Sequence, residues 1–272
     1  MIDYYARVAE GILPHLRGRP LTLRRFPDGV EGKAFFEKRS PKHRPEWVRT
    51  AAVAFDRAGE IDFTVCDNLA TLTWLAQLAA LELHPSLSRA SDMSKPTVVA
   101  FDLDPGPPAN VIDCCRIALR LRELLAELGL ECFPKTSGSK GLQVYVPLNG
   151  KADYERTGGF AHAVAKLLER ESPDRIVSKM AKEARKGKVF IDWSQNNRSK
   201  TTIAVYSLRA RERPTASTPL DWDEVEAGSR KRKPEALAFE ADEVVRRLDD
   251  RGDLFQPVLK LRQRLPDLDP GS

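Results

Sequence analysis

An apolar segment that stops abruptly at a proline- and glycine-rich turn places the strongest constraint on this chain. Residues 97–104 read Thr-Val-Val-Ala-Phe-Asp-Leu-Asp, and Pro-Gly-Pro-Pro follows at 105–108. The apolar residues predict a buried strand, and the turn ends it because proline lacks the N–H group needed for a ladder hydrogen bond. The segment 109–128 repeats apolar residues at helical spacing up to Gly129, so it predicts a helix.

Two acids lie at the end of this predicted strand. Residues two apart in a strand point to the same face, so Asp102 and Asp104 project together while Phe101 and Leu103 pack behind them. Adjacent carboxylates repel unless a cation lies between them, and Mg²⁺ and Mn²⁺ prefer carboxylate oxygens. The pair therefore predicts a divalent metal site. The alternative is that the acids cap the helix that begins near Ala109.

A third acid occupies a second apolar segment. Asp192 lies within Val-Phe-Ile-Asp-Trp at 189–193, where every neighbour is expected to be buried. A lone charge in such a strand is costly unless it is paired or bound to a metal ion. Three strand-borne aspartates can hold two metal ions, one activating an attacking 3′-hydroxyl and the other stabilising a leaving pyrophosphate.

A short turn between these acids is rich in small residues. Residues 135–141 read Lys-Thr-Ser-Gly-Ser-Lys-Gly, and glycines let backbone N–H groups approach an anion closely. Lys140 adds a positive charge and Ser137 a hydroxyl group. The turn lacks the spacing of a Walker phosphate-binding loop, and an ordinary hairpin turn is an equal alternative.

Two arginines follow further along the chain. Arg209 and Arg211 lie two residues apart in an extended segment at 207–211, so both guanidinium groups are expected on one side. Such a pair can bind a triphosphate bidentately. Taken alone, the segment favours two solvated arginines at a sheet edge.

The rest of the chain predicts a mixed α and β core. Before residue 90 the expected elements are short strands at 21–25, 34–37, 50–55 and 61–65, a helix at 69–83 with His84 at its C-terminal end, and a loop at 88–96. After the first aspartates they are a strand and turn at 132–141, a strand at 142–146, a helix at 159–170, strands at 189–193 and 202–206, and mostly helix from Leu220 onward.

Composition narrows the class of protein. The 272 residues are 42% hydrophobic and 31% charged, as in ordinary globular proteins. No apolar stretch approaches a membrane span, and the N-terminus lacks the order of a signal peptide, so we expect a cytoplasmic protein with no membrane partner. Four cysteines without metal-ligand spacing are expected to be inert core residues. They are Cys66, Cys114, Cys115 and Cys132.

Positive charge is grouped along the chain rather than spread evenly. The net charge is +5, and the richest segments are 17–25, 38–49 and 179–213. Such clusters suit a phosphate-rich partner, although a charged run is more often a solvated face. The clusters alone therefore support nucleic acid binding only weakly.

Three motifs, in order and spacing, resemble those of the ligase-D-type polymerase domains of the archaeo-eukaryotic primase superfamily. They are Phe-Asp-Leu-Asp-Pro-Gly at 101–106, Thr-Ser-Gly-Ser-Lys-Gly-Leu at 136–142 and Phe-Ile-Asp-Trp-Ser-Gln-Asn at 190–196. Shorter similarities extend the resemblance to most of the chain. They lie at 35–38, 74–77, 82–85, 200–202 and 206–209.

The resemblance implies an α+β fold. A primase-type catalytic core, similar to RNA-recognition modules, would pack with a strand-rich N-terminal part, and helices would flank mixed and antiparallel sheets. The resemblance implies a single domain over 1–272, with a DNA-end-binding part at 1–90, the catalytic core at 91–215 and a helical part at 216–272.

The implied activity is that of a DNA-directed polymerase or primase, a nucleotidyltransferase. It would fill gaps and extend primers at DNA breaks in non-homologous end joining, with two Mn²⁺ or Mg²⁺ ions and a preference for ribonucleotides over deoxynucleotides. Implied partners are double-stranded DNA ends, gapped or primer–template DNA, a Ku-like protein and an ATP-dependent DNA ligase, and the implied location is the nucleoid.

The resemblance also assigns roles to residues. The implied metal ligands are Asp102, Asp104 and Asp192. The implied nucleotide-binding residues are His84, Ser137, Gly138, Lys140, Gly141, Gln143, Arg209 and Arg211. Arg25 and Lys38 are the implied ligands of a DNA 5′-phosphate across a gap. Many relatives have histidine where this chain has Gln143, which donates a hydrogen bond but carries no charge.

Two other functions remain open at this level. The Asp-x-Asp motif also resembles that of haloacid-dehalogenase phosphatases, although it follows a hundred residues of chain and lacks their paired final acids. A non-catalytic DNA-end-binding module is the other alternative, although carboxylates near phosphates would only weaken such binding. Within the polymerase interpretation, the sequence does not separate priming from extension.

Overall fold

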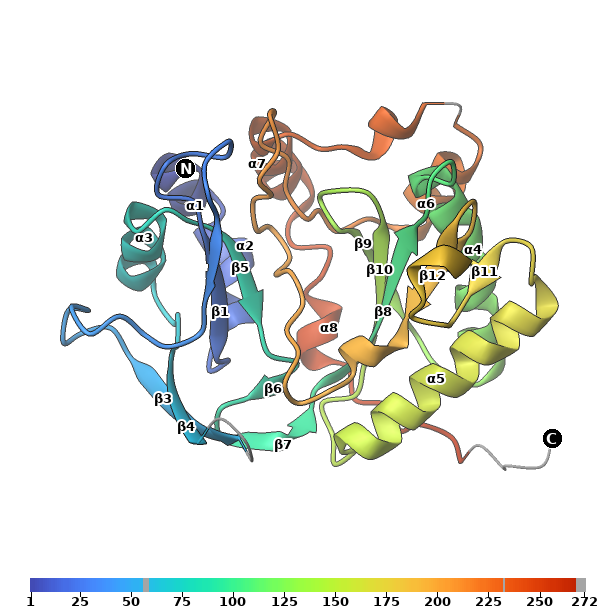
Figure 1. Cartoon of the computed structure of the whole chain (residues 1–272), viewed down its shortest axis with the longest axis horizontal. Helices are drawn as coiled ribbons and strands as arrows, with labels where there is room; N and C mark the ends of the chain where they lie inside the picture. The colour runs from blue at the N-terminus through green and yellow to red at the C-terminus, as the bar shows by residue number, and fades with distance from the viewer. Residues whose placement is uncertain (56–58, 232, 268–272) are drawn as a thin grey trace. The chain divides into compact units, whose positions relative to one another are not determined.

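In the computed structural model, the strand that carries Asp102 and Asp104 is the central strand of a five-stranded sheet (Figure 1). This strand, β8, spans Val98–Pro105, and the strand order is β11-β12-β8-β10-β9. The neighbours of β8 on both sides run antiparallel to it, and only β11 and β12 are parallel. The other strands span Phe133–Thr136 (β9), Leu142–Pro147 (β10), Ile176–Val177 (β11) and Val189–Asp192 (β12).

Two helices complete the topology of this sheet. Helix α4 (Val111–Glu127) follows β8, and helix α5 (Tyr154–Glu171) follows β10. Apart from the short edge strand β11, the chain order is β8-α4-β9-β10-α5-β12, and β8 and β10 are the inner two of these four strands. This is the βαββαβ fold to which RNA-recognition modules belong. The predicted α+β class and the predicted type of core are therefore confirmed.

The structure describes residues 1–55, 59–231 and 233–267, which divide into two units. The five-stranded sheet belongs to unit 2, which is formed by Ser94–Asn197, Pro219–Ala238 and the residues from Leu254 onward. Unit 1 is formed by Met1–Met93, Arg198–Thr218 and Phe239–Asp253. The single domain expected over 1–272, with three consecutive parts, stays a prediction.

A second sheet forms the framework of unit 1. Strands β2 (Phe35–Glu37), β1 (Leu21–Arg25) and β5 (Ala80–Pro85) are antiparallel, with β1 in the middle. Strands β3 (Thr50–Phe55) and β4 (Gly59–Thr64) pair as a separate antiparallel hairpin. The four strands predicted before residue 65 are therefore confirmed within a few residues.

Helices also contribute to unit 1, and the sequence analysis missed the first two. They are α1 (Ile2–Arg7), α2 (Ala9–Leu16), α3 (Leu69–Gln77) and α7 (Ala241–Arg251). Buried Tyr5, Val8 and Ile12 recur at helical spacing at the N-terminus, and this is the signal that predicts a helix there.

The helix predicted over 69–83 is too long. It ends at Gln77, because Ala79 adopts a left-handed φ of 57° that a helix cannot contain. The chain then continues as β5, which pairs with β1. His84 is therefore a strand residue and does not lie at the end of a helix.

Two further expectations are corrected. The predicted loop at 88–96 contains a short hairpin of β6 (Ser88–Arg89) and β7 (Asp92–Pro96). The predicted strand at 202–206 is irregular instead. Tyr206 has a φ of 63°, and the amides of Thr202 and Ala204 donate hydrogen bonds to β5 without forming a regular ladder.

The remaining predicted elements are found. Helices α4 and α5 and strands β8, β10 and β12 match their predicted positions to within about five residues. The residues after 220 are mostly helical, as predicted, in α6 (Trp222–Ser229), a 3₁₀ turn at Pro234–Leu237, α7 and α8 (Pro257–Lys260). Other 3₁₀ turns span Lys182–Arg185 and Trp193–Gln195.

Two expectations from composition can be compared with the structure. All four cysteines are free and buried, and burial raises the pKa of each thiol, so the prediction of inert core residues is confirmed. Within the described part of the chain, no helix is long and apolar enough to cross a membrane.

Candidate active site

The three predicted metal ligands lie on adjacent strands of unit 2. Asp192 on β12 is the direct partner of Asp102 on β8, and Phe190 is the partner of Asp104. Residues directly opposite in an antiparallel pair share a face, with Cβ atoms about 5 Å apart. Asp104 lies two residues beyond Asp102 and so shares that face too. The sheet therefore gathers the three carboxylates into one acidic cluster.

Asp102 lies in an unfavourable environment for a charged carboxylate. Its Oδ1 atom is buried and has no hydrogen-bond partner. Burial raises the pKa of Asp102, and the charges of Asp104 and Asp192 raise it further, against a hydrogen bond from Gln143 that lowers it. A buried, unpartnered carboxylate oxygen next to two other acids is a site for a cation.

The fit of a divalent ion depends on all three carboxylates. Across residues 1–55, 59–231 and 233–267, no three Asp, Glu, His or Cys side chains are already close enough to hold an ion together. Asp192 Oδ1 accepts hydrogen bonds from the amide and hydroxyl groups of Ser194, and its Oδ2 accepts one from Gln195. Carboxylates repel one another, so a bound cation would draw these three closer together. The donor set fits Mg²⁺ or Mn²⁺.

The alternative role of the acids as helix caps is excluded by the start of α4. Asn110 caps this helix by accepting a hydrogen bond from the Ile112 amide, and Asp113 completes a capping box with the Asn110 amide. Asp102 and Asp104 take no part in the cap. The helix end therefore leaves no structural need for two aspartates on β8.

A buried lysine supports Asp102 through Gln143. The Lys135 side chain is fully buried, and its Nζ atom donates a 2.6 Å hydrogen bond to Gln143 Oε1. This bond occupies the amide oxygen of Gln143, so the amide NH₂ group is the one that donates to Asp102. The two side chains thus link a positive charge to the acidic cluster.

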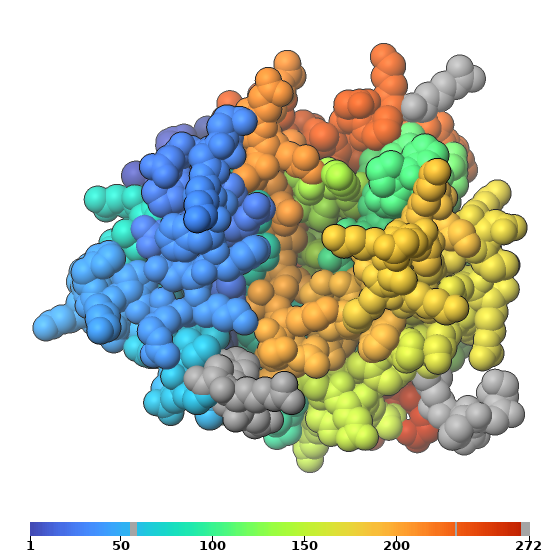
Figure 2. Space-filling view, viewed as in Figure 1, coloured from blue at the N-terminus to red at the C-terminus, as the bar shows by residue number. Residues whose placement is uncertain are grey.

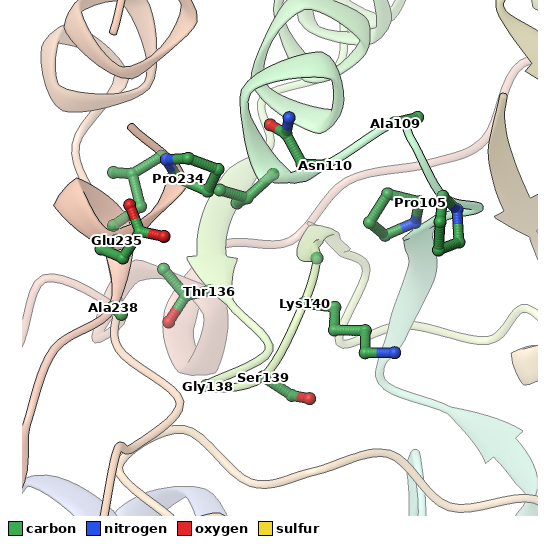
Figure 3. Close-up of a pocket in the computed structure, with 14 residues that line it drawn as sticks. Pro105, Ala109, Asn110, Thr136, Gly138, Ser139, Lys140, Pro234, Glu235 and Ala238 are labelled. Atoms are coloured by element: carbon green, nitrogen blue, oxygen red, sulfur yellow. The ribbon is translucent and has the colours of Figure 1, made fainter. Parts of the chain in front are cut away.

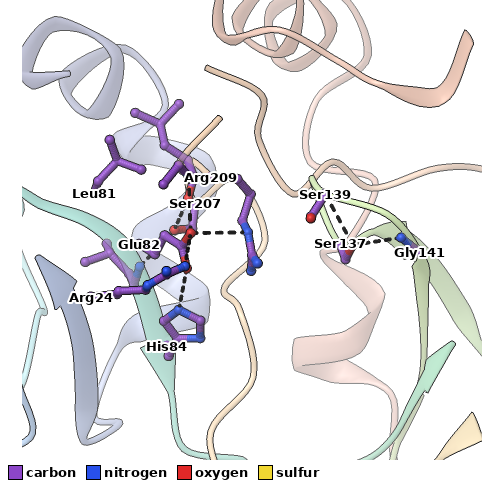
Figure 4. Close-up of polar contacts among 12 residues, drawn as sticks. Arg24, Leu81, Glu82, His84, Ser137, Ser139, Gly141, Ser207 and Arg209 are labelled. Carbon is purple, nitrogen blue, oxygen red and sulfur yellow. Dashed lines mark hydrogen bonds and ion pairs between the residues drawn. The ribbon is translucent and has the colours of Figure 1, made fainter. Parts of the chain in front are cut away.

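The turn at residues 137–141 is closed by its own serine. Ser137 Oγ accepts hydrogen bonds from the amides of Ser139 (3.3 Å) and Gly141 (3.2 Å), and the Ser137 amide donates to the Gly141 carbonyl (2.9 Å) (Figure 4). Two of the N–H groups expected to face an anion are therefore used within the turn. Lys140 is exposed, and the hydroxyl hydrogen of Ser137 can still be donated.

A cavity lies beside this turn within unit 2. Its volume is about 290 Å³, and it is lined by the end of β8, the start of α4, the turn and the 3₁₀ turn at Pro234–Leu237. Figure 3 shows Pro234 and Glu235 on one side and Lys140 and Pro105 on the other. The turn that carries Lys140 therefore borders an open space as well as β8.

The other predicted nucleotide-binding residues belong to unit 1. Glu82 and His84 lie on β5, two residues apart, and Arg209 approaches Glu82 with Nε 3.5 Å from Oε1 (Figure 4). His84 Nε2 lies 3.1 Å from Glu82 Oε2. The structure thus brings His84 and Arg209 together around the carboxylate of Glu82. We call these three residues the Glu82 cluster. Arg211 lies two residues beyond Arg209 in an exposed stretch.

The two candidate 5′-phosphate ligands differ in their surroundings. Arg25 is engaged inside unit 1, because its guanidinium group lies 3.2 Å from Glu37 and its Nε donates to the Leu78 carbonyl. Lys38 is exposed at the start of the basic segment 38–49. Residues of this part of the chain, drawn in blue, cover the face of unit 1 seen in Figure 2.

Comparison with known proteins identifies the family. The family model described as LigD, primase-polymerase domain matches residues 1–255. The chain belongs to this family of nucleotidyltransferases. Among solved structures, it is similar to the polymerase domain from Mycobacterium tuberculosis ligase D in complex with DNA, with a TM-score of 0.87 and 40% identity over 96% of this chain and 92% of that one.

Full-length relatives extend beyond the matched region. The chain is 41% identical over 260 residues to the multifunctional non-homologous end joining protein LigD of Mycolicibacterium smegmatis, covering 95% of this chain and 33% of that protein. It is 31% identical to the bifunctional LigD protein of Bacillus subtilis, covering 93% of this chain and 40% of that protein. The LigD primase-polymerase chain thus spans about a third of the first protein and two fifths of the second.

Three residues of this LigD primase-polymerase chain gain structural roles that the sequence analysis did not assign. Glu82 joins His84 to Arg209, and Lys135 supports Gln143. Asn196 uses both ends of its amide to pair with the backbone of Ala100, which anchors the turn after Asp192 against β8. Glu82 is a charged residue between Leu81 and Leu83, and this is the available sequence signal, whereas Lys135 and Asn196 have polar neighbours in the sequence.

Gly141 generates a test of the close packing between the turn and the acidic strand. A Cβ atom at residue 141 would lie 2.0 Å from the carbonyl oxygen of Leu103. We expect Gly141→Ala to lower the free energy of unfolding by about 1–3 kcal/mol, because the backbones must separate. Urea unfolding provides the measurement. Gly159→Ala, at an exposed position of α5 with open space around it, should instead raise this free energy by about 1 kcal/mol. Similar values for both variants would contradict the prediction.

The support of Asp102 by Gln143 can be tested separately. Gln143→Leu removes the donor to Asp102 and the acceptor for Lys135 from a buried position. We expect a loss of about 1–3 kcal/mol in the free energy of unfolding, because buried polar groups lose their partners. Gln77→Leu, at an exposed residue, serves as the control and should change it by less than about 0.5 kcal/mol. If Gln143→Leu leaves the free energy of unfolding unchanged, the hydrogen bonds that link Lys135, Gln143 and Asp102 do not stabilise the fold.

Proposed function

We propose that this chain is a template-directed nucleotidyltransferase that fills gaps and extends primers at DNA breaks in non-homologous end joining, with two divalent ions bound at Asp102, Asp104 and Asp192. The proposal is carried by the acidic cluster, in which two paired strands place three carboxylates on one face and leave Asp102 Oδ1 without a partner. Membership of the LigD primase-polymerase family supports it.

The acidic cluster would hold the ions that this chemistry requires. When bound, divalent ions supply Lewis-acid stabilisation of the attacking 3′-hydroxyl oxygen and of the leaving pyrophosphate. Asp102, Asp104 and Asp192 provide the carboxylate ligands. Gln143 donates a hydrogen bond to Asp102, and the Oδ1 atom, which has no hydrogen-bond partner, would be available to a cation. We propose Mn²⁺, with Mg²⁺ as a substitute, as the resident ion.

Roles in binding the incoming nucleotide are proposed for residues of each unit, taken separately, on the basis of family membership. In unit 2, Lys140 supplies a positive charge and Ser137 a hydroxyl donor for triphosphate oxygens, on a turn shaped by Gly138 and Gly141. In unit 1, His84, Arg209 and Arg211 are the proposed ligands. Gln143, which donates a hydrogen bond to Asp102, is a further proposed nucleotide-binding residue. We propose ribonucleotides as the preferred substrates, on the basis of family membership alone.

DNA is the proposed second substrate. The related domain from Mycobacterium tuberculosis is described in complex with DNA, and basic segments of this chain suit phosphate contacts. We propose that Lys38, on the exposed face of unit 1, binds the 5′-phosphate across a gap, with Arg25 in support. A Ku-like end-binding protein and an ATP-dependent ligase are the proposed partners. We further propose that the chain forms a single polymerase domain and that it acts at the nucleoid.

Loss of an acidic ligand should abolish synthesis without loss of DNA binding. We expect Asp104→Asn to reduce primer extension on a gapped duplex by at least about a thousandfold, because metal-dependent stabilisation of the transition state is lost. Extension with Mn²⁺ and either ribo- or deoxynucleotides gives the rate and the sugar preference, and fluorescence anisotropy gives the DNA affinity. Asp223→Asn, at an exposed residue of α6, is the matched control and should keep the wild-type rate.

Three outcomes of this experiment distinguish the functions considered. Normal extension by Asp104→Asn would remove the acidic cluster from the mechanism. Tight DNA binding without extension by the wild type would favour a non-catalytic end-binding module. Hydrolysis of a generic phosphate monoester by the wild type would favour a phosphatase.

The proposed 5′-phosphate contact generates a second test. Lys38→Glu should weaken the preference for a 5′-phosphorylated over an unphosphorylated gap by about tenfold, the effect of losing one charge-assisted hydrogen bond. Dissociation constants for the two DNA substrates give the preference. Lys166→Glu, an exposed charge reversal on α5, controls for general electrostatics and should affect both substrates equally. A wild type without any preference would remove this role from Lys38.

A further inference from the structure

Glu82 is a nearly fully buried carboxylate with several partners in unit 1. Its side chain is 2% exposed, and its Oε1 atom lies 3.2 Å from Arg24 Nη1 and 3.5 Å from Arg209 Nε. The amide of Ala210 donates to the same oxygen over 3.1 Å, and Oε2 faces His84 Nε2 over 3.1 Å. Buried carboxylates persist where such partners compensate the loss of water.

The charge state of Glu82 fixes the hydrogen-bonding role of His84. Burial alone would raise the pKa of Glu82, but the hydrogen bond from His84, the charge of Arg209 and the Ala210 amide together lower it to about 2. The carboxylate is therefore ionised at neutral pH and can only accept hydrogen bonds. His84 Nε2 must carry the hydrogen, so Glu82 sets both the tautomer and the orientation of the ring.

The segment that carries Arg209 is also attached to β5 at the residues on either side of Glu82. Ser207 Oγ accepts a 2.9 Å hydrogen bond from the Leu83 amide. The hydroxyl group of Tyr5 donates to the Leu81 carbonyl (2.7 Å) and accepts from the Leu208 amide (3.3 Å). These bonds fix the backbone next to Arg209, and Glu82 contacts its guanidinium group.

Glu82 contacts two cationic side chains at once. The guanidinium groups of Arg24 and Arg209 both approach its Oε1 atom. A carboxylate in this place can orient cationic groups that bind an anion. An acid directly beside a phosphate would otherwise repel it, so a role in orientation explains the position of Glu82.

We propose that Glu82 is a positioning residue of the nucleotide site, which holds His84 and Arg209 in the geometry that receives the incoming nucleotide. This inference rests on the proposed function, in which His84 and Arg209 contact that nucleotide. Glu82 itself does not touch the substrate. Its effect therefore passes through the two residues that it holds.

Glu82→Gln is the first variant to measure. Glutamine keeps the shape and an acceptor for the Ala210 amide, but it removes the charge that holds Arg209 and fixes the tautomer of His84. We expect the KM for the nucleotide in templated extension to rise about tenfold, with kcat and the dissociation constant for gapped DNA changed less than about threefold. Glu240→Gln, which alters the exposed pair with Arg213, is the control and should leave KM unchanged.

A double-mutant cycle separates positioning from simple stabilisation. In a background that lacks both His84 and Arg209 side chains (His84→Ala with Arg209→Ala), Glu82→Gln should change nucleotide binding less than about threefold. Binding of a fluorescent nonhydrolysable ATP analogue measures this even where extension is slow. An equal tenfold effect in both backgrounds would overturn the proposal, because Glu82 would then act independently of these residues.

A second variant covers the case in which Glu82→Gln does not fold. Glu82→Asp keeps the charge but withdraws it by one methylene group, so KM should rise while the thermal midpoint stays close to that of the wild type. If both variants unfold, or if KM is unchanged while the wild type extends primers, the positioning role is wrong and the proposed function stands. If the wild type itself shows no templated extension, the proposed function fails first.

Discussion

Repulsion among carboxylates that share one face of a sheet is the constraint on which the rest of unit 2 depends. Asp102, Asp104 and Asp192 are brought together by the pairing of β8 with β12. Such a cluster lowers stability unless cations or hydrogen-bond donors compensate it. The supporting groups follow from that need, because Gln143, Ser194 and Gln195 all donate to these carboxylates.

Each unit contains a buried charged side chain near groups of the opposite charge, and the buried charge is positive in unit 2 and negative in unit 1. In unit 2, a fully buried Lys135 acts through Gln143 on a cluster of acids. In unit 1, a buried Glu82 lies among basic and aromatic side chains, with Arg24 also over the ring of Phe36. In each unit one buried charge orders several groups of the opposite sign.

The sequence predicted helices and strands correctly where the spacing of apolar residues agreed with residues that end an element. Strand β8, the proline-rich turn and helix α4 could be predicted because each boundary has a residue that the neighbouring element cannot contain. The sequence alone could not establish that Asp102 lies opposite Asp192, because the register of two strands depends on contacts between distant segments. Ala79 was misread because it favours helices, and tertiary packing placed it at a positive φ. Glu82 was assigned to that helix, so its partners were not predictable.

The left-handed conformation of Ala79 has a consequence for how this region can change. Ala79 lies between the end of α3 at Gln77 and the start of β5 at Ala80. Side chains repeat every 3.6 residues in the helix before it and every two residues in the strand after it. Inserting or deleting one residue there would exchange the two faces of β5 and turn Glu82 and His84 away from Arg209. Chain length between α3 and β5 is therefore fixed more strictly than residue identity, and variation in this part of the molecule must proceed by substitution.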